Sequence, residues 1–470
     1  MKDPVIIIGA GPAGLTAAYE LAKRKTHSVL LEKDTMVGGI ARTAQYKGYR
    51  FDIGGHRFFT KVDRVMDMWK EVLGTDFLRR PRLSHIYYKK KFFSYPIKPF
   101  DVVKKLGAYE TALAGFSFLN ARLNPRVREE SFEDYIINNF GERLYRTFFK
   151  SYTEKVWGIP CTEIRAEWAA QRIKGLSFTS LVQAALFGNR GNKIKTLIEE
   201  FHYPRFGPGM MWEKTKELVE QSGYGKVRFG IRVEAILHDG TKITGVRIKD
   251  EKGKEEVIKG STLVSSMPIG ELLHRMEPAV SREARDAADG LHYRDFITVA
   301  LVVNREHMFP DNWIYVHEPG VQVGRIQNFK NWSPEMVGDS KKTCLGLEYF
   351  CFTSDPIWSM KDEDLVRLGA EELEKIGLAK KDEVLDGAVV RMEKTYPVYD
   401  AAYERAMPVI KEAVGKFSNL YPVGRNGMHK YNNQDHAMYT AMLSVENMFG
   451  AKHDIWDVNV ERVYHEEKEV

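Results

Sequence analysis

Residues 5 to 33 carry the pattern that most constrains the fold of this chain. An apolar run leads into Gly9-x-Gly11-x-x-Gly14 and an alanine-rich stretch, and a second apolar run ends at Glu32. In a strand–turn–helix, the first glycine permits a tight turn, the second lets a pyrophosphate approach the backbone, and the third lets the helix pack on the strand. The helix N-terminus then faces the phosphates. Glu32 is placed to accept a hydrogen bond from a ribose hydroxyl, so the stretch predicts a βαβ unit that binds a dinucleotide.

Length and charge limit the number of domains and the kinds of ligand. The 470 residues predict two to three domains. The chain holds 70 basic and 64 acidic residues, with a net charge of +6. This mixture argues against a nucleic-acid-binding protein and leaves room for a local cationic pocket that takes an anionic substrate. Three cysteines without metal-ligand spacing predict no metal site and indicate a reducing compartment.

Targeting signals are not expected. The first strand begins near residue 5, which leaves no room for a signal peptide, and no apolar run approaches the ~20 residues of a membrane helix. A cytoplasmic location is therefore the simplest expectation.

The rest of the chain predicts an α/β protein with an inserted helical domain and an antiparallel β-sheet domain. Alternating apolar residues predict hairpins that turn at Lys47-Gly48 and at residues 238–241, and a parallel strand within 261–268. A helical stretch has Ser131 as N-cap with Asp134 in its first turn, and residues 175–191 form a loop that can move. The expected division is 1–90, 196–270 and 406–470 for dinucleotide binding, 91–195 for the helical insertion, and 271–405 for an antiparallel substrate domain.

Two further glycine motifs favour a flavin over a nicotinamide. Gly38-Gly39-x-x-Arg42 resembles the segment of amine-oxidase-type flavoproteins that lies along the pyrophosphate and the isoalloxazine. Near the other end of the chain, Gly424-Arg425-x-Gly427 precedes a helix whose N-terminus would lie near the flavin pyrimidine. Together they predict FAD.

The chain also resembles the UDP-galactopyranose mutase family, in particular its eukaryotic branch. The motifs that carry the resemblance are Gly54-Gly55-His56 before Phe58-Phe59, YYKKKFFSYPIKP (87–99), KVWGIP (155–160), Arg172 fifteen residues after Trp157, Tyr315 with Arg325, Tyr396-Pro397, and GRNGMHKY (424–431) followed by Asn433-Gln434-Asp435-His436. The order of the last motif is the most specific of these matches.

The resemblance implies a nucleotide-sugar mutase that converts pyranose and furanose rings with no net redox change. Reduced FAD attacks the anomeric carbon through N5 while Arg172 and Arg325 hold the diphosphate, since guanidinium groups offer bidentate donors of fixed geometry. His56 would lie against the flavin. The other substrate-binding residues implied are Tyr95, Trp157, Tyr315, Tyr396 and Tyr431. The cofactor-binding residues implied are Gly9, Gly11, Ala13, Gly14, Glu32, Lys33, Gly38, Gly39, Arg42, Gly55, His56, Val233, Gly424, Arg425, Asn433 and Gln434.

Some choices stay open at this stage. Ile97, Lys98 and Thr153 depart from the family's uridine-site pattern, because an ammonium cannot pair with a uracil edge as an amide does. The nucleotide and the sugar are therefore undetermined, as are the oligomeric state and a role for NADPH or NADH as reductant. The alternatives are an FAD-dependent amine oxidase or a protoporphyrinogen-oxidase or desaturase-like oxidoreductase, and a flavin-bound partner protein without turnover.

Overall fold

The computed structural model describes residues 3–95, 99–166 and 200–459, and its centre is a parallel sheet. The five strands, in spatial order, are β20 (Leu420–Pro422), β13 (Thr262–Ser265), β1 (Val5–Ile8), β2 (Ser28–Leu31) and β9 (Gly225–Arg228). The expected β1–helix–β2 unit is present, with α1 (Pro12–Lys23) between the two strands. The strand expected within 261–268 is β13, and it pairs in parallel with β1 on one side and β20 on the other.

Two layers cover this sheet because successive residues of β1 face opposite sides. Val5 and Ile7 join the core under α1, together with the helices α2 (Asp63–Leu73), α10 (Gly209–Gln221) and α17 (Gln434–Met448). Ile6 and Ile8 join the core on the other face. That face is covered by β10 (Arg232–His238), β11 (Ile243–Lys249), β12 (Glu255–Lys259), β14 (Met276–Glu277), α11 (Ile269–His274), α12 (Arg282–Asp289) and α15 (Ala401–Gly415).

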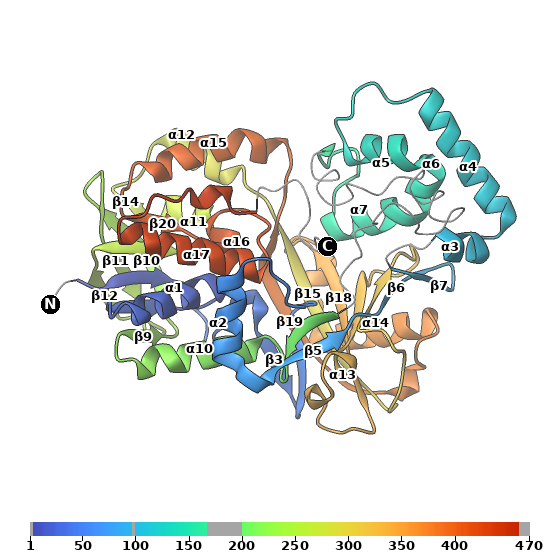
Figure 1. The fold of residues 1–470 in the computed structure, drawn as a ribbon, viewed down its shortest axis with the longest axis horizontal. Helices are drawn as coiled ribbons and strands as arrows, with labels where there is room; N and C mark the ends of the chain where they lie inside the picture. Colours follow the sequence, from blue (N-terminus) through green and yellow to red (C-terminus); the bar gives the residue numbers. More distant parts are fainter. Residues whose placement is uncertain (1–2, 96–98, 167–199, 460–470) are drawn as a thin grey trace.

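A seven-stranded sheet lies beside this three-layer unit (Figure 1). Its strands, in spatial order, are β19 (Val384–Pro397), β15 (Tyr293–Val303), β18 (Thr343–Cys351), β17 (Arg325–Asn328), β16 (Trp313–Val316), β6 (Ser84–Tyr88) and β7 (Lys91–Ser94). All neighbours are antiparallel except β6 and β16. The β6–β7 hairpin thus spans residue 90, where a domain boundary was expected, and α14 (Asp362–Lys375) packs on one face of the sheet.

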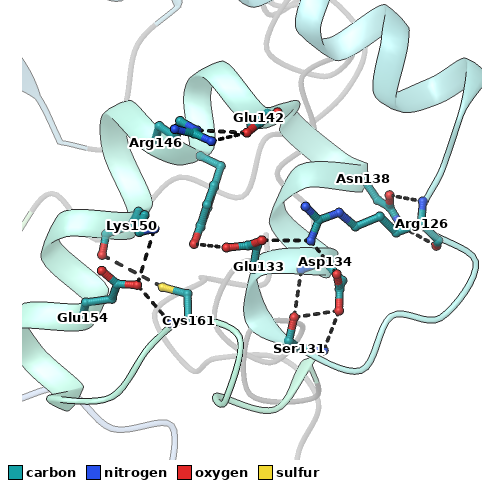
Figure 2. Close-up of polar contacts among 11 residues, drawn as sticks. Arg126, Ser131, Glu133, Asp134, Asn138, Glu142, Arg146, Lys150, Glu154 and Cys161 are labelled. Carbon is teal, nitrogen blue, oxygen red and sulfur yellow. Dashed lines mark hydrogen bonds and ion pairs between the residues drawn. The ribbon is translucent and has the colours of Figure 1, made fainter.

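The helices between residues 99 and 157 form a helical insertion, at the upper right of Figure 1. They are α3 (Pro99–Leu106), α4 (Ala108–Leu123), α5 (Phe132–Phe140), α6 (Glu142–Leu144), a π-helical turn (Tyr145–Lys150) and α7 (Ser151–Trp157). The predicted N-cap is confirmed: the Ser131 hydroxyl accepts the Asp134 N–H at 3.1 Å, and the Asp134 carboxylate accepts the Ser131 N–H at 3.1 Å (Figure 2). The predicted loop 175–191 lies outside the described residues.

Both predicted hairpins are present. β3 (Thr43–Tyr46) and β4 (Tyr49–Asp52) pair across Lys47 and Gly48, which have φ of 48° and 87°. β10 and β11 pair across the turn at 238–241. A small ladder of β5 (Phe77–Pro81) and β8 (Glu200–Pro204) links the segments on either side of the helical insertion. Gly9 follows β1, Gly424 lies two residues after β20, and Gly38 is hydrogen-bonded to Ala10, so glycine-rich segments from three regions of the chain meet at the carboxyl end of the parallel sheet.

Candidate active site

The glycines of the fingerprint form a close backbone cradle. Gly9 has φ of 93°, a conformation that disfavours a side chain, and a Cβ on Gly14 would lie 1.9 Å from the Gly9 carbonyl oxygen. The Gly38 N–H donates to the Ala10 carbonyl at 2.9 Å, so the second glycine motif is fixed to the first. Gly11 and Gly39 face each other, since a Cβ on Gly39 would lie 3.4 Å from the Gly11 Cα. Bare backbone therefore lines the start of α1.

The acid of the fingerprint is buried at the end of β2. The Glu32 carboxylate accepts the Ala10 N–H at 2.7 Å and the Asp34 N–H at 2.9 Å. It therefore fixes the loops on both sides of the cradle. Lys33 is exposed, and Arg42 pairs with Asp34 and contacts the Met392 sulfur at 3.3 Å.

The segment from Gly424 to the start of α17, which we call the C-terminal return, packs directly on α1. Gly424 has φ of 78°, and a Cβ there would lie 3.0 Å from the Ala13 Cβ. Its N–H donates to the Thr440 hydroxyl at 3.1 Å, within α17. Asn433 is the N-cap of α17, whereas the Gln434 side chain accepts the indole N–H of Trp212 at 3.1 Å. The N-termini of α1 and α17 thus approach the same region, which favours anionic or electron-rich groups there.

His56 lies beside this region and is neutral. Its Nε2 is 2.8 Å from the Ile53 carbonyl oxygen, and because a carbonyl only accepts, Nε2 carries the hydrogen. Burial lowers the pKa of His56 to about 4, and the charges of Arg425 and Arg325 act in the same direction. His56 is therefore a positioned neutral imidazole near two cations.

A buried ion pair connects the glycine segment at 54–55 with the antiparallel sheet. Arg325 in β17 lies opposite Glu348 in β18, and its Nε donates to the Glu348 carboxylate, whose side chain is fully buried. Gln327 donates its amide to the same carboxylate at 2.7 Å, and a Cβ on Gly55 would lie 2.8 Å from the Gln327 Nε2. Burial alone would lower the pKa of Arg325, but Glu348 and the nearby tyrosines together outweigh burial and hold that pKa well above its usual value.

Aromatic residues from distant segments gather around Arg325. Its charge acts on the phenols of Tyr152, Tyr315 and Tyr396. Tyr315 lies 4.9 Å from Tyr95 and 5.6 Å from Tyr152, measured between ring centroids. Burial raises the pKa of Tyr152 well above its usual value, which keeps this phenol a hydrogen-bond donor at neutral pH.

The other half of this cluster is a stacked tyrosine pair. The rings of Tyr396 and Tyr431 lie 5.6 Å apart with planes 15° apart, and Trp157 lies 6.4 Å from Tyr431. The Arg425 guanidinium stands over both tyrosines, 4.8 Å from the Tyr431 ring. The structure thus brings together six predicted residues: Tyr95, Trp157, Tyr315, Arg325, Tyr396 and Tyr431.

Other predicted residues are placed differently or lie outside the description. Arg172, Ile97 and Lys98 belong to segments that the structure does not describe. Val233 is buried in β10, and its carbonyl accepts a hydrogen bond from Arg275 at 2.6 Å. Thr153 is buried in α7.

Three residues of the cluster escape the sequence prediction: Tyr152, Gln327 and Glu348. For Glu348 a signal exists, because it is the one charged residue in the apolar run TCLGLEYFCF, and a charge in a buried strand needs a partner.

The cradle fits the adenylate and pyrophosphate part of FAD. Side-chain carbon is excluded where the two glycine motifs meet, two helix N-termini converge, and a buried carboxylate fixes the strand end. His56 lies close enough to Arg325 and Arg425 for their charges to act on it, and Gly55 lies against Gln327 of the same cluster.

Comparison with known proteins assigns the class. Residues 12–408 match the profile of the flavin-containing amine oxidoreductases, so the chain belongs to this family of FAD-dependent flavoproteins. The fold is that of UDP-galactopyranose mutase: a crystal structure of the reduced enzyme superposes with a TM-score of 0.84, 21% identity, and 98% of each chain covered.

Curated relatives include both mutases and oxidoreductases. dTDP-fucopyranose mutase of Escherichia coli is 28% identical over 173 residues, which is 35% of this chain and 44% of that protein. 1-Hydroxycarotenoid 3,4-desaturase of Flavobacterium sp. (strain P99-3) is 25% identical over 272 residues, 53% of this chain and 54% of that protein. The chain thus spans about half or less of the length of these curated relatives.

Proposed function

We propose that this protein is a flavin-dependent nucleotide-sugar mutase that interconverts pyranose and furanose forms. The observation that carries the proposal is the buried guanidinium of Arg325 among the rings of several tyrosines. A diphosphate needs fixed cationic and hydroxyl donors, and this cluster offers both on a rigid sheet. An oxidase for an apolar or amine substrate would not require such an anion-binding set.

The residues of the chain have distinct tasks in this reaction. Reduced FAD, when bound, supplies the nucleophile for the anomeric carbon. Arg325 binds the diphosphate that departs and holds it near the sugar until it returns, which converts the return into an intramolecular step. Tyr315, Tyr396 and Tyr431 would donate hydrogen bonds to the remaining oxygens. Arg172 is proposed as a second cation.

The aromatic groups also shape the space beside the diphosphate. Trp157 lies against Tyr431, and Tyr95 lies against Tyr315. We assign them to the base and the sugar. The neutral His56 contributes position rather than charge, since its Nε2–H is already bonded to the Ile53 carbonyl.

The test uses the purified yellow protein, reduced with dithionite and incubated with UDP-galactose and, separately, with dTDP-fucopyranose. The expected product has unchanged mass and a new retention time, and it forms only with reduced flavin. Arg325→Ala should abolish turnover and weaken nucleoside diphosphate binding, whereas Arg282→Ala, whose side chain is 88% exposed, should change neither. Peroxide formation from an amine, with no isomerised nucleotide sugar, would instead identify an oxidase.

A further inference from the structure

The outer face of α4 exposes large apolar side chains to solvent. Tyr109, Phe116, Leu119 and Leu123 are 76%, 72%, 56% and 81% exposed, and we call these four residues the α4 face. Their spacing of seven, three and four residues places them on one side of the helix. The opposite side, with Ala114, Phe118 and Ala121, packs into the core of the insertion. The helix is therefore apolar on both sides, and among the described residues only the side with Ala114, Phe118 and Ala121 is covered.

A cationic cavity borders the N-terminal end of this face. It has a volume of about 310 Å³, and Glu110, the neighbour of Tyr109, lies in its wall. The charged residues of the lining are five cations and this single carboxylate: Lys89, Lys91, Lys105, Arg143, Arg146 and Glu110. Arg143 forms a two-pronged contact with Glu110 at 2.6 and 2.8 Å. Figure 2 shows the second pair, Arg146 with Glu142, at 2.6 Å.

The surroundings of the cavity add further positive charge. Lys89 and Lys90 have φ of 47° and 59°, and they form the turn of the β6–β7 hairpin. The described residues 89–95 and 99–150 contain eleven Lys and Arg against seven Asp and Glu, an excess of four positive charges. In Figure 1, α3, α4 and β7 lie at one end of the molecule, on the side away from the parallel sheet. Charge and exposed apolar surface thus coincide at this end.

We propose that this end of the molecule docks on an anionic lipid bilayer. The α4 face enters the interface between head groups and acyl chains, and the cationic cavity receives the phosphate of a lipid head group. Apolar side chains on one helix side combined with lysines and arginines are the features that bind interfacial helices to anionic membranes. Figure 1 shows α4 on the outer edge of the insertion, so the helix can lie along a surface.

A second copy of this chain fits the surface less well. Two-fold pairing through the α4 face would bring the same patch of both copies together, and therefore two like-charged lysine turns. A small soluble anion would explain the cavity but not the four exposed side chains beside it. An anionic bilayer accounts for both features. The proposal does not rest on the flavin chemistry, because the α4 face contributes no residue to the tyrosine cluster described above.

Co-sedimentation with vesicles tests the proposal on the full-length flavoprotein. Vesicles of phosphatidylcholine with about one third phosphatidylglycerol are compared with vesicles of phosphatidylcholine alone. The wild type should bind the anionic vesicles, and high salt should weaken binding because it screens the charges. Phe116→Ser with Leu123→Ser should weaken binding about ten-fold or more, since two large side chains no longer enter the interface. Lys90→Glu with Lys91→Glu should weaken it as well.

The matched control is Phe449→Ser with Val257→Ser, two apolar residues that are 55% and 52% exposed on elements outside the helical insertion. This pair should bind vesicles like the wild type. The melting temperatures of all variants should stay close together, because each changed side chain is largely in solvent.

Several results would overturn the proposal. The proposal fails if the wild type does not bind vesicles, if it binds both vesicle types equally, or if Phe116→Ser with Leu123→Ser binds as the wild type does. A concentration-dependent dimer that the serine pair abolishes, without vesicle binding, would identify a second copy as the occupant. Tight binding of inorganic phosphate without vesicle binding would identify a soluble anion.

Discussion

Glu348→Gln should destabilise the protein mainly through the lost ion pair with Arg325. The substitution keeps the shape of the side chain but removes the charge opposite Arg325, and the Glu348 side chain is 0% exposed. Removing one partner of a buried ion pair costs about 3–5 kcal/mol, because it leaves an uncompensated charge. The Arg325 side chain retains 18% exposure, so water offsets part of this cost. We therefore expect a loss of about 2–4 kcal/mol in the free energy of unfolding.

Urea unfolding of the flavin-loaded protein, followed by tryptophan fluorescence, measures this loss as a shift of the midpoint at constant slope. Arg325→Met should cost a similar amount, because it leaves Glu348 unpaired. In the double variant the two losses should not add, and the coupling energy should exceed about 1.5 kcal/mol. Glu363→Gln, at an exposed carboxylate of α14, is the matched control and should stay within about 0.5 kcal/mol of wild type. If the unfolding free energy of Glu348→Gln also stays within about 0.5 kcal/mol of wild type, the Arg325–Glu348 pair does not stabilise the sheet as described.

Three further outcomes follow from particular contacts. Gly14→Ala should cost at least about 3 kcal/mol and yield protein without flavin, because its Cβ would collide with the Gly9 carbonyl; Gly115→Ala, with open space around it, should be neutral or stabilising in the same melting assay. Burial raises the pKa of Asp52 to about 7. The protonated Asp52 therefore contributes up to about 4 kcal/mol to the free energy of unfolding, fully present below pH 4 and lost as pH rises through 7. Asp52→Asn should flatten that part of the curve of unfolding free energy against pH. An unchanged curve would contradict the assignment. Ser131→Ala removes the cap of α5 and should lower the unfolding free energy by about 1 kcal/mol, whereas an unchanged midpoint would contradict this role.

Local sequence patterns predict the nucleotide-binding half of the fold well. The β1–α1–β2 unit, two hairpin turns and the N-cap Ser131 each depend on residues that are close together in the chain. Such features need only turn chemistry, capping and apolar periodicity. The order of strands in the sheet needs more, because β13 and β20 join it from more than two hundred residues away.

The sequence predicts a site residue when the chemistry of its side chain alone indicates a role. It does not predict one whose role depends on which residue lies next to it in the folded protein. Arg325 and the tyrosines have the chemistry of an anion-binding group, which is visible in the sequence. The partner of Arg325 is set by the β17–β18 register, and sequence periodicity alone does not fix which residue lies opposite. Gln434 is predicted from the sequence to bind the cofactor, but its side-chain oxygen accepts a hydrogen bond from Trp212 in α10. No sequence motif connects these two residues, so the sequence does not reveal this contact.

The two arginines of the cluster, Arg425 and Arg325, are held by different kinds of contact. Arg425 donates its Nε to the Asn432 carbonyl and its Nη1 to the Thr395 carbonyl, both at 2.9 Å. It therefore ties the C-terminal return to the end of β19, where Tyr396 stands, and its flat face covers the stacked tyrosines. Arg325 instead engages a side chain through its Nε, and its Nη2 lies 3.8 Å from the position that a Cβ on Gly54 would take. A guanidinium that donates to a single carboxylate through one nitrogen keeps its other donors for a ligand, which is why we propose Arg325 rather than Arg425 as the group that binds the diphosphate.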